Sequence, residues 1–373
     1  MSDRVIYVAA TPDKPIGGIR VLYQHVELLT AAGYDAAVWH PKPGMTHGWF
    51  DSSVPHVYGA RLELDATDTL VIPECVVENH DPAPGCRKVI YNQNYFLTFA
   101  SVDWPEFPAW DPTPPIWTSS DTSVTVLTRL RGVLPIDTVD YIPLAIDPEL
   151  FRSDPSVFRE RKIVWMPRKR REEAQLLHAL LASDSRFDDV VLRPLDGLAT
   201  SRIAAELASA SVFVALGRDE GFRLPVAEAL ASGCAVVGYP AGGGAELFDA
   251  PGAHPIADPD TPAIVDRVAD VLENEPSAEE RATYRGVGRV EIHHVPAAKT
   301  VAARAAGRPY SACPGRRREL PATHALRSQP GRSQERGRDR VVGSRHSTPP
   351  VALLMRRRRD VPESPRLRRS SRA

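Results

Sequence analysis

Residues 211–248 read SVFVALGRDEGFRLPVAEALASGCAVVGYPAGGGAELF, and they carry the clearest structural signal in the chain. The apolar run that ends at Leu216 predicts a strand buried in a parallel sheet. A charged loop with a glycine follows, and Pro225 then occupies a position that suits the first turn of a helix. A second apolar run at residues 235–239 predicts the next strand. The stretch therefore has the strand–helix–strand order of a parallel α/β sheet.

The N-terminal residues repeat this order. Residues 4–10 are apolar and β-branched, as in a buried strand, and Gly17-Gly18 follow in a predicted loop. Apolar residues then recur at spacings of three and four, which is typical of one face of a helix. These residues are Ile19, Leu22, Val26 and Leu29. Gly33 stands where the C-terminal end of that helix is expected.

Predicted strands and helices alternate in both halves of the chain. In the first half we predict further strands at residues 36–39, 69–72, 88–91, 124–127 and 140–143. In the second half we predict strands at residues 162–166, 190–193 and 212–216, and helices at residues 172–181, 201–210 and 225–231. The proline-rich residues 104–115 predict a surface loop. This alternation indicates two doubly wound, Rossmann-like parallel-sheet domains, residues 1–145 and 146–285, that face a cleft.

The C-terminal part of the chain has a different composition. Residues 281–373 contain 22 arginines and one lysine against six acidic residues, a net charge of +17, whereas residues 1–280 carry a net charge of −18. So polar a segment cannot form a hydrophobic core, and we expect residues 286–373 to be a disordered, Arg-rich tail. An out-of-frame reading of a GC-rich gene would give this composition. The alternatives are a genuine unstructured tail and an arm that binds nucleic acid or membrane through its clustered arginines.

The sequence predicts a cytoplasmic protein. Its first apolar run is too short for a secretory signal, and no stretch approaches the roughly 20 apolar residues of a membrane-spanning helix. The cysteines lack the spacing of a zinc or redox motif and are expected to be reduced thiols; they are Cys75, Cys86, Cys234 and Cys313. The histidines likewise show no metal-ligand spacing, so no metal is expected.

Two glutamates flank the predicted start of the helix at Pro225. Glu220 lies in the preceding loop and Glu228 about one turn inside the helix, and the backbone amides of Phe222, Arg223 and Leu224 lie between them. Free amides at a helix N-terminus attract anions, while carboxylates accept hydrogen bonds from hydroxyl groups. The order carboxylate, amides, carboxylate therefore suits a ligand with a diphosphate in the middle and a polyol at each end. A sugar nucleotide has this order.

The segment EGFRLPVAE at residues 220–228 resembles the paired-glutamate motif of retaining GT-B glycosyltransferases, in particular glycosyltransferase family four. The resemblance extends to Gly17-Gly18, to IPLAIDPELF at residues 142–151 and to WMPRKRR at residues 165–171. It covers roughly residues 1–285. The resemblance implies transfer of a hexosyl or deoxyhexosyl group from a nucleotide diphosphate sugar, with retention of anomeric configuration and without a metal cofactor.

The same resemblance implies roles for individual residues. Glu220 would hold hydroxyls of the donor sugar, and Glu228 would hold those of the ribose. The amides of residues 222–224 would bind the sugar and the diphosphate, and Gly17-Gly18 would let the backbone approach the phosphate. Arg168, with Lys169 or Arg170, would neutralise the leaving diphosphate. The partners implied are the donor and a glycan or lipid-linked acceptor, with peripheral association at the cytoplasmic membrane face; nucleic acid is not expected.

The sequence departs from the family pattern at two places. Arg223 replaces the glycine of EGFGLP, so its side chain could alter the donor pocket or add a phosphate contact. No amphipathic helix follows Glu280, although the end of a GT-B chain usually crosses back onto the first domain. Asn92-Gln93-Asn94 follows a predicted strand, and two interpretations remain open for it: hydrogen bonding to an acceptor sugar, or capping of the strand end.

Three rival functions remain open at this stage. A sugar-nucleotide epimerase would bind the same donor but would need no acceptor. An inactive remnant would bind nucleotide and have lost its activity with the crossing helix. A nucleic-acid-binding protein would act through the Arg-rich tail.

Overall fold

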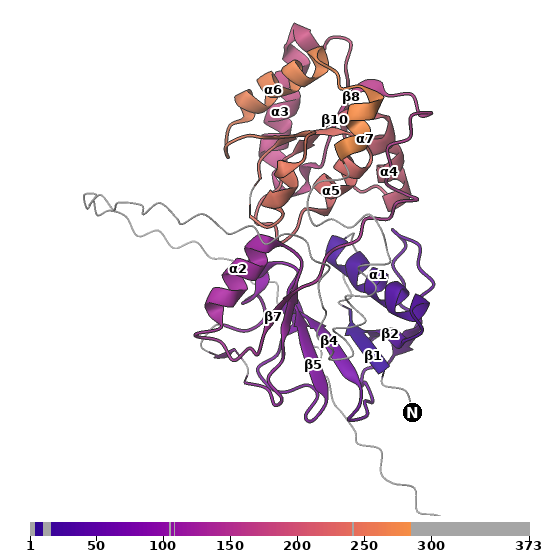
Figure 1. The fold of residues 1–373 in the computed structure, drawn as a ribbon, viewed down its shortest axis with the longest axis vertical. Coiled ribbons are helices and arrows are strands. Elements are labelled where there is room, and N and C mark those ends of the chain that lie inside the picture. The colour runs from indigo at the N-terminus through magenta and orange to yellow at the C-terminus, as the bar shows by residue number, and fades with distance from the viewer. Residues whose placement is uncertain (1–3, 10–15, 104–105, 108, 241, 285–373) are drawn as a thin grey trace, which may run out of the picture.

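The described residues form two α/β domains (Figure 1). The computed structural model describes residues 4–9, 16–103, 106–107, 109–240 and 242–284. The tail predicted at residues 286–373 lies outside the described residues. The predicted domain boundary at residue 145 falls between the last strand of the first sheet and the first strand of the second. Within the described part, no helix is long and apolar enough to cross a membrane.

The first domain is a seven-stranded parallel sheet with the order β3-β2-β1-β4-β5-β6-β7. Its strands are β1 (Arg4–Val8), β2 (Asp35–His40), β3 (His56–Tyr58), β4 (Thr69–Pro73), β5 (Arg87–Tyr91), β6 (Ile116–Thr118) and β7 (Val139–Tyr141). Its helices are α1 (Gly17–Ala31) and α2 (Asp121–Leu130), and short 3-10 turns lie at η1 (Glu74–Val76) and η2 (Tyr95–Leu97).

Strand β1 explains why the apolar run at the N-terminus is continuous. Val5 and Tyr7 belong to the core layer that includes the buried face of α1, whereas Ile6 and Val8 belong to the layer on the opposite face of the sheet. Successive side chains of a strand point to opposite faces, so a sheet covered on both faces needs apolar residues at every position. The sequence pattern of β1 is therefore that of a central parallel strand.

Two local predictions for this domain were wrong. Gly17-Gly18 are the first two residues of α1 and not part of the loop before it. Residues 124–127, predicted as a strand, lie in α2, because the Ser120 side chain accepts a hydrogen bond from the Ser123 amide (3.1 Å) and caps a helix there. The strand of this segment is β6.

The predicted C-terminal end of α1 agrees with the structure. Gly33 has a φ of 84° and its amide donates to the Thr30 carbonyl, as expected of a residue that ends a helix.

The second domain is a five-stranded parallel sheet with the order β12-β11-β10-β8-β9. Its strands are β8 (Glu160–Trp165), β9 (Val191–Pro194), β10 (Ala210–Ala215), β11 (Ala235–Gly238) and β12 (Ala253–Pro255). Its helices are α3 (Arg171–Ser183), α4 (Thr200–Ser209), α5 (Leu224–Ala231), α6 (Thr261–Glu273) and α7 (Ala278–Thr283), and 3-10 turns lie at η4 (Pro167–Lys169), η5 (Ser185–Phe187) and η6 (Ala245–Asp249). One core layer joins the sheet to α4 and α5, and the other joins it to α3 and α6.

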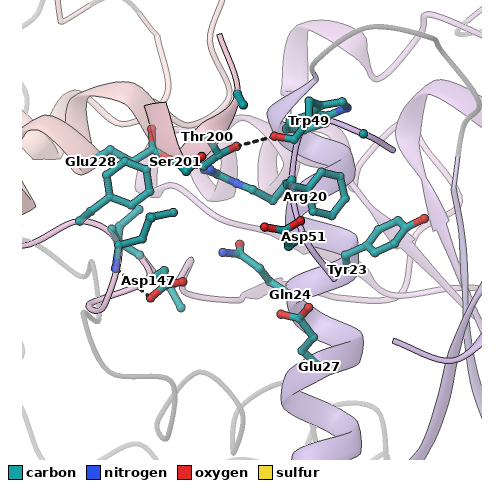
Figure 2. Close-up of a pocket in the computed structure, with 17 residues that line it drawn as sticks. Arg20, Tyr23, Gln24, Glu27, Trp49, Asp51, Asp147, Thr200, Ser201 and Glu228 are labelled. Atoms are coloured by element: carbon teal, nitrogen blue, oxygen red, sulfur yellow. Dashed lines mark hydrogen bonds and ion pairs between the residues drawn. The ribbon is translucent and has the colours of Figure 1, made fainter. Parts of the chain in front are cut away.

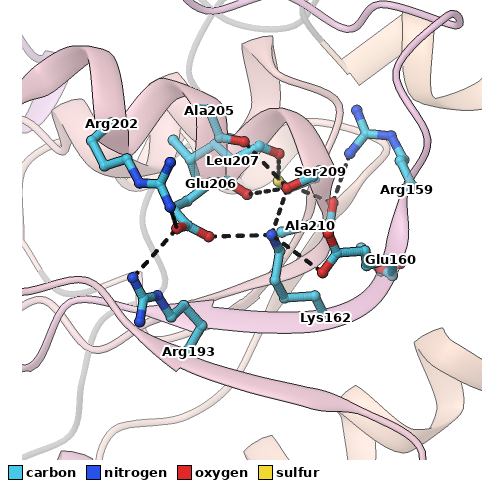
Figure 3. Close-up of polar contacts among 12 residues, drawn as sticks. Arg159, Glu160, Lys162, Arg193, Arg202, Ala205, Glu206, Leu207, Ser209 and Ala210 are labelled. Carbon is cyan, nitrogen blue, oxygen red and sulfur yellow. Dashed lines mark hydrogen bonds and ion pairs between the residues drawn. The ribbon is translucent and has the colours of Figure 1, made fainter.

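An ion-pair network fixes α4 against the sheet (Figure 3). Lys162 on β8 is buried, and its Nζ lies 3.2 Å from Oε2 of the buried Glu206 on α4. Arg193 and Arg202 approach the other oxygen of Glu206 at 3.5 Å and 3.3 Å. A buried charge is tolerated only when it is paired, so these contacts hold α4 in one position on the sheet. The N-terminus of α4 reaches the boundary between the domains.

Candidate active site

The N-termini of α1 and α5 meet at the boundary between the two domains (Figure 1). A methyl group added at Gly17, the first residue of α1, would lie 3.0 Å from Leu224 Cδ1, at the start of α5. Phe222 and Leu224 pack against the cores of both domains. No side chain caps either helix among the described residues. The free amides and the positive ends of two helix dipoles therefore converge on one place, which favours an anion there.

Glu220 lies beside this place, on the loop that follows β10. Its Oε2 is 2.7 Å from Nζ of Lys169, which belongs to η4 just after β8. The Glu220 carbonyl accepts a hydrogen bond from the Gly243 amide at 2.7 Å, which fixes the backbone of the loop. β8 and β10 are neighbouring strands, so the pair stands at the carboxyl edge of the sheet, where α/β proteins bind ligands.

The basic residues after β8 have different surroundings. Arg168 is exposed, and its side chain has no hydrogen bond or ion pair with any described residue. Arg170 is instead held by Glu173 (2.8 Å) and Asp258 (3.0 Å) and lies 4.9 Å from the centre of the Tyr239 ring. Burial acts to lower the pKa of Arg170, but these two carboxylates raise it overall. Of the three side chains predicted to contact the diphosphate, those of Arg168 and Lys169 are exposed to solvent. The Arg170 side chain is held by carboxylates of its own domain.

Arg223 packs beneath the loop that carries Glu220. Its side chain is buried and donates a hydrogen bond to the Tyr239 carbonyl, and its guanidinium lies 5.8 Å from the Phe248 ring centre. A methyl group at Gly217 would lie 2.9 Å from Arg223 Nη2, so the glycine leaves the space that the guanidinium fills. Burial lowers the pKa of Arg223 to about 10, against the opposing effect of the Glu220 charge. The side chain therefore stays charged at neutral pH and supports the loop from below.

Glu228 forms an ion pair with Arg20 of α1, and this pair joins the two domains. Only 5% of the Glu228 side chain and 12% of the Arg20 side chain are exposed. The pair borders a cavity of about 360 Å³ between the domains (Figure 2). The cavity is also lined by Gln24, Glu27, Trp49, Asp51, Asp147 and Thr200. Carboxylates, an amide and aromatic rings on its wall suit a ligand with hydroxyl groups and a flat ring.

Arg20 was not predicted as a site residue, although the sequence contains a signal for it. A cation in the first turn of a helix opposes the helix dipole. An arginine at that position, two residues after Gly17-Gly18, therefore indicates an anionic partner from elsewhere in the chain. Its partner Glu228 lies 208 residues away, so local sequence patterns could not identify it.

Asn94 contacts the second domain and caps η2, whereas the side chains of Asn92 and Gln93 make contacts within the first domain. The Asn92 side chain is buried and donates to Thr98 Oγ1 at 2.8 Å. Gln93 Nε2 donates to the Gly18 carbonyl at 3.1 Å, and Asn94 Nδ2 donates to the Asp219 carbonyl at 2.9 Å. In this arrangement the three side chains are used for contacts within the protein.

The segment rests on Glu74, a buried carboxyl group at the end of β4. Glu74 Oε2 accepts a hydrogen bond from the Gln93 amide at 3.1 Å. Burial raises the pKa of Glu74 from its ordinary value of 4.5 to about 7, although the amides of Gln93 and Asn94 partly oppose the change. This group therefore titrates near neutral pH, and it holds the segment whose residue Asn94 contacts the second domain.

Replacing Glu74 by glutamine should remove a pH-dependent loss of stability. The folded protein binds the proton of Glu74 more tightly than the unfolded chain does, so its contribution is full below pH 4.5 and is lost as the pH rises to about 7. At about 1.4 kcal/mol per pKa unit, the ceiling is on the order of 3 kcal/mol. Urea unfolding at pH 5 and pH 8 should show a smaller difference for Glu74→Gln than for the wild type. Equal differences would contradict this prediction.

Among the described residues, no group of three His, Cys, Asp or Glu side chains is placed to hold a metal ion. Cys75, Cys86 and Cys234 are free thiols.

Comparison with solved structures identifies the fold. Anabaena HepE, in complex with UDP and glucose, aligns with a TM-score of 0.56 and 11% identity, over 82% of this chain and 100% of its own. Sucrose-phosphate synthase from Thermosynechococcus elongatus aligns with a TM-score of 0.52 and 14% identity, over 82% of this chain and 98% of its own. The comparison with curated proteins finds no match. The two parallel-sheet domains therefore have the GT-B fold.

The family comparison concerns the second domain. Residues 161–274 match the family model described as glycosyl transferases group 1. This segment contains β8 to α6, and with them Lys169, Glu220 and Glu228. The fold and the matching domain together support a GT-B glycosyltransferase.

Proposed function

We propose that this protein transfers a sugar from a nucleotide diphosphate sugar to a glycan or lipid-linked acceptor, with retention of anomeric configuration. One observation carries the proposal: the N-terminus of α5 meets that of α1, and in the chain Glu220 precedes this helix start while Glu228 follows it by one turn. Hydroxyl groups bind carboxylates and phosphates bind helix N-termini, so the site has the chemical order of a sugar nucleotide. Anabaena HepE, which has the same fold, was solved with UDP and glucose.

Each residue then has a role in the proposed reaction. Glu220 holds hydroxyls of the donor sugar, and Glu228 holds those of the ribose. The amides of Phe222, Arg223 and Leu224 and the start of α1 at Gly17-Gly18 bind the diphosphate. As the bond between the anomeric carbon and the phosphate oxygen breaks, Arg168 and Lys169 and the two helix ends stabilise the charge on the diphosphate. The acceptor oxygen bonds to the same face of the sugar, and its proton passes to the departing phosphate.

The ion pair between Lys169 and Glu220 fits this proposal. The ammonium lies 2.7 Å from the carboxylate, and in the proposed complex it would lie between the sugar and the diphosphate. The pair prepares both groups before the donor arrives, which reduces the cost of organising them in the transition state. We further propose a hexosyl or deoxyhexosyl donor and a reaction at the cytoplasmic face of a membrane.

The test is an assay of the purified protein with a panel of nucleotide diphosphate sugars, with and without glycan and lipid-linked acceptors. Release of nucleoside diphosphate should depend on an acceptor, and NMR of the product should show the anomeric configuration of the donor. Interconversion of donor sugars without acceptor would overturn the proposal in favour of an epimerase. Donor binding without any turnover would indicate an inactive remnant.

A further inference from the structure

Arg20 is a buried cation at the boundary between the domains, in the first turn of α1. One of its terminal nitrogens binds Glu228 Oε1, and its guanidinium lies 5.8 Å from the centre of the Phe151 ring. Its Nε is buried and has no hydrogen-bond partner among the described residues. A buried donor without a partner is costly, and a cation in the first turn opposes the helix dipole. The ion pair with Glu228 therefore leaves Arg20 incompletely satisfied.

The ion pair between Arg20 and Glu228 lies close to the place where the N-termini of α1 and α5 meet. Arg20 lies three residues beyond Gly17 in α1, and Glu228 lies four residues beyond Leu224 in α5. One helical turn rises about 5.4 Å, so the pair is about one turn away from the place where Gly17 and Leu224 meet. In a sugar nucleotide the ribose follows the diphosphate directly. On the proposed function the pair therefore lies where the ribose would lie, and the arginine side chain is long enough to reach back to the diphosphate.

The ion pair also restricts what Glu228 can bind. Its Oε1 is taken by Arg20, and its side chain is almost fully buried. The hydroxyls of a ribose would have to share this carboxylate with a guanidinium. A guanidinium presents five donors in a planar fork that matches the oxygens of a phosphate. A diphosphate would accept hydrogen bonds from both the Nε and the terminal nitrogens.

We propose that Arg20 is a donor-binding residue that exchanges partners. This inference rests on the proposed function. In the structure Arg20 binds Glu228, and this ion pair joins the two domains. When a nucleotide diphosphate binds, the guanidinium turns onto the diphosphate and releases Glu228 to the ribose hydroxyls. Arg20 thus contributes to diphosphate binding and opposes binding of the nucleoside alone.

The test measures binding by calorimetry and compares each nucleoside diphosphate with the nucleoside that has the same base: UDP with uridine, and GDP with guanosine. Replacing Arg20 by glutamine should weaken binding of the diphosphate that the wild type prefers by about tenfold or more, because a hydrogen bond to a charged group is lost. Binding of the matching nucleoside should stay the same or become tighter, because Glu228 is released. Arg20→Lys keeps the charge without the fork and should fall between the two. Equal weakening of both ligands would show a purely structural ion pair and overturn the proposal.

Glu246→Ala is the matched control. It removes another contact between the domains, the hydrogen bond from the Asp121 amide to Glu246 Oε1 (3.1 Å), away from the cavity. Its effects on diphosphate and nucleoside should be equal. If it instead reproduced the selective loss of diphosphate binding, the effect would come from domain closure and the proposal would fail.

Glu228→Gln provides a second test of the proposal, which does not depend on whether the Arg20 variants fold. It releases Arg20 from its ion pair, so inorganic pyrophosphate should bind more tightly than to the wild type. Unchanged or weaker pyrophosphate binding would overturn the proposal. If the wild type bound no nucleoside diphosphate at all, the proposed function would fail and this inference with it. If the wild type bound one and Arg20→Gln bound it equally well, only the role of Arg20 would fail.

Discussion

Replacing Glu220 by alanine is expected to lower kcat about 10³-fold while the protein stays folded. Glu220 is partly exposed on a loop, and its backbone contact with Gly243 does not involve the side chain. Loss of the carboxylate should therefore cost little stability. It removes the acceptor for the sugar hydroxyls and leaves Lys169 without its partner at 2.7 Å. Steady-state kinetics with the donor found in the transfer assay, together with a thermal unfolding curve, would measure both effects.

The neighbouring carboxylate provides the control for Glu220. Asp219 is exposed and has a φ of 53°, a backbone conformation that asparagine also tolerates. Asp219→Asn removes a negative charge from the same loop without touching Lys169, and kcat should change by less than about twofold. Undiminished turnover in Glu220→Ala would refute the assignment of this residue. An equal loss in Asp219→Asn would mean that the charge of the loop matters and not the position of one carboxylate.

The predictions that succeeded depended on short, local patterns. Residues 5–8 of β1 are apolar at every position, and the segment between β10 and α5 combines a strand end, a glycine and a proline within a few residues. Each of these has a backbone reason that is visible in the sequence. The strand predicted at residues 124–127 was wrong because the local residues and the cap favour different structures. Val124, Thr125 and Val126 favour a strand, but the cap at Ser120 begins a helix there.

Side-chain partners that lie far apart in the sequence could not be predicted in this way. Arg170 sits in the basic segment that suggests phosphate binding, but its carboxylate partner Asp258 lies 88 residues away. The motif predicts a role for Glu228, but nothing in it points to the ion-pair partner Arg20. The first pair depends on how the second domain folds and the other on how the two domains face each other, and the sequence of one segment holds no information on either. The roles predicted for Arg168, Lys169 and Glu220 stay predictions until activity is measured.

Gly221→Ala is expected to separate the loop that carries Glu220 from the first domain. A methyl group at Gly221 would lie 2.0 Å from the Gln93 carbonyl oxygen and 2.3 Å from Asn94 Cα. These are backbone atoms of the other domain and cannot rotate away as a side chain could. The two backbones must move apart by an ångström or more, which would also break the hydrogen bond from Ser123 Oγ to the Gly221 carbonyl (3.3 Å). A misplacement of this size at a reacting group can reduce the rate about 10²-fold.

The expected result for Gly221→Ala is therefore a fall in kcat/KM of about 10²-fold with the fold of each domain preserved, since the clash lies between the domains. Transfer kinetics and small-angle X-ray scattering would measure the two consequences, a slower enzyme and a larger radius of gyration. Gly132→Ala is the matched control, because an added methyl group there meets nothing within 4 Å. It should leave both quantities unchanged. If Gly221→Ala retained the kcat/KM of Gly132→Ala, the close contact between Gly221 and Gln93 would not be part of the catalytic state, and Glu220 would act from a domain arrangement more open than the one described.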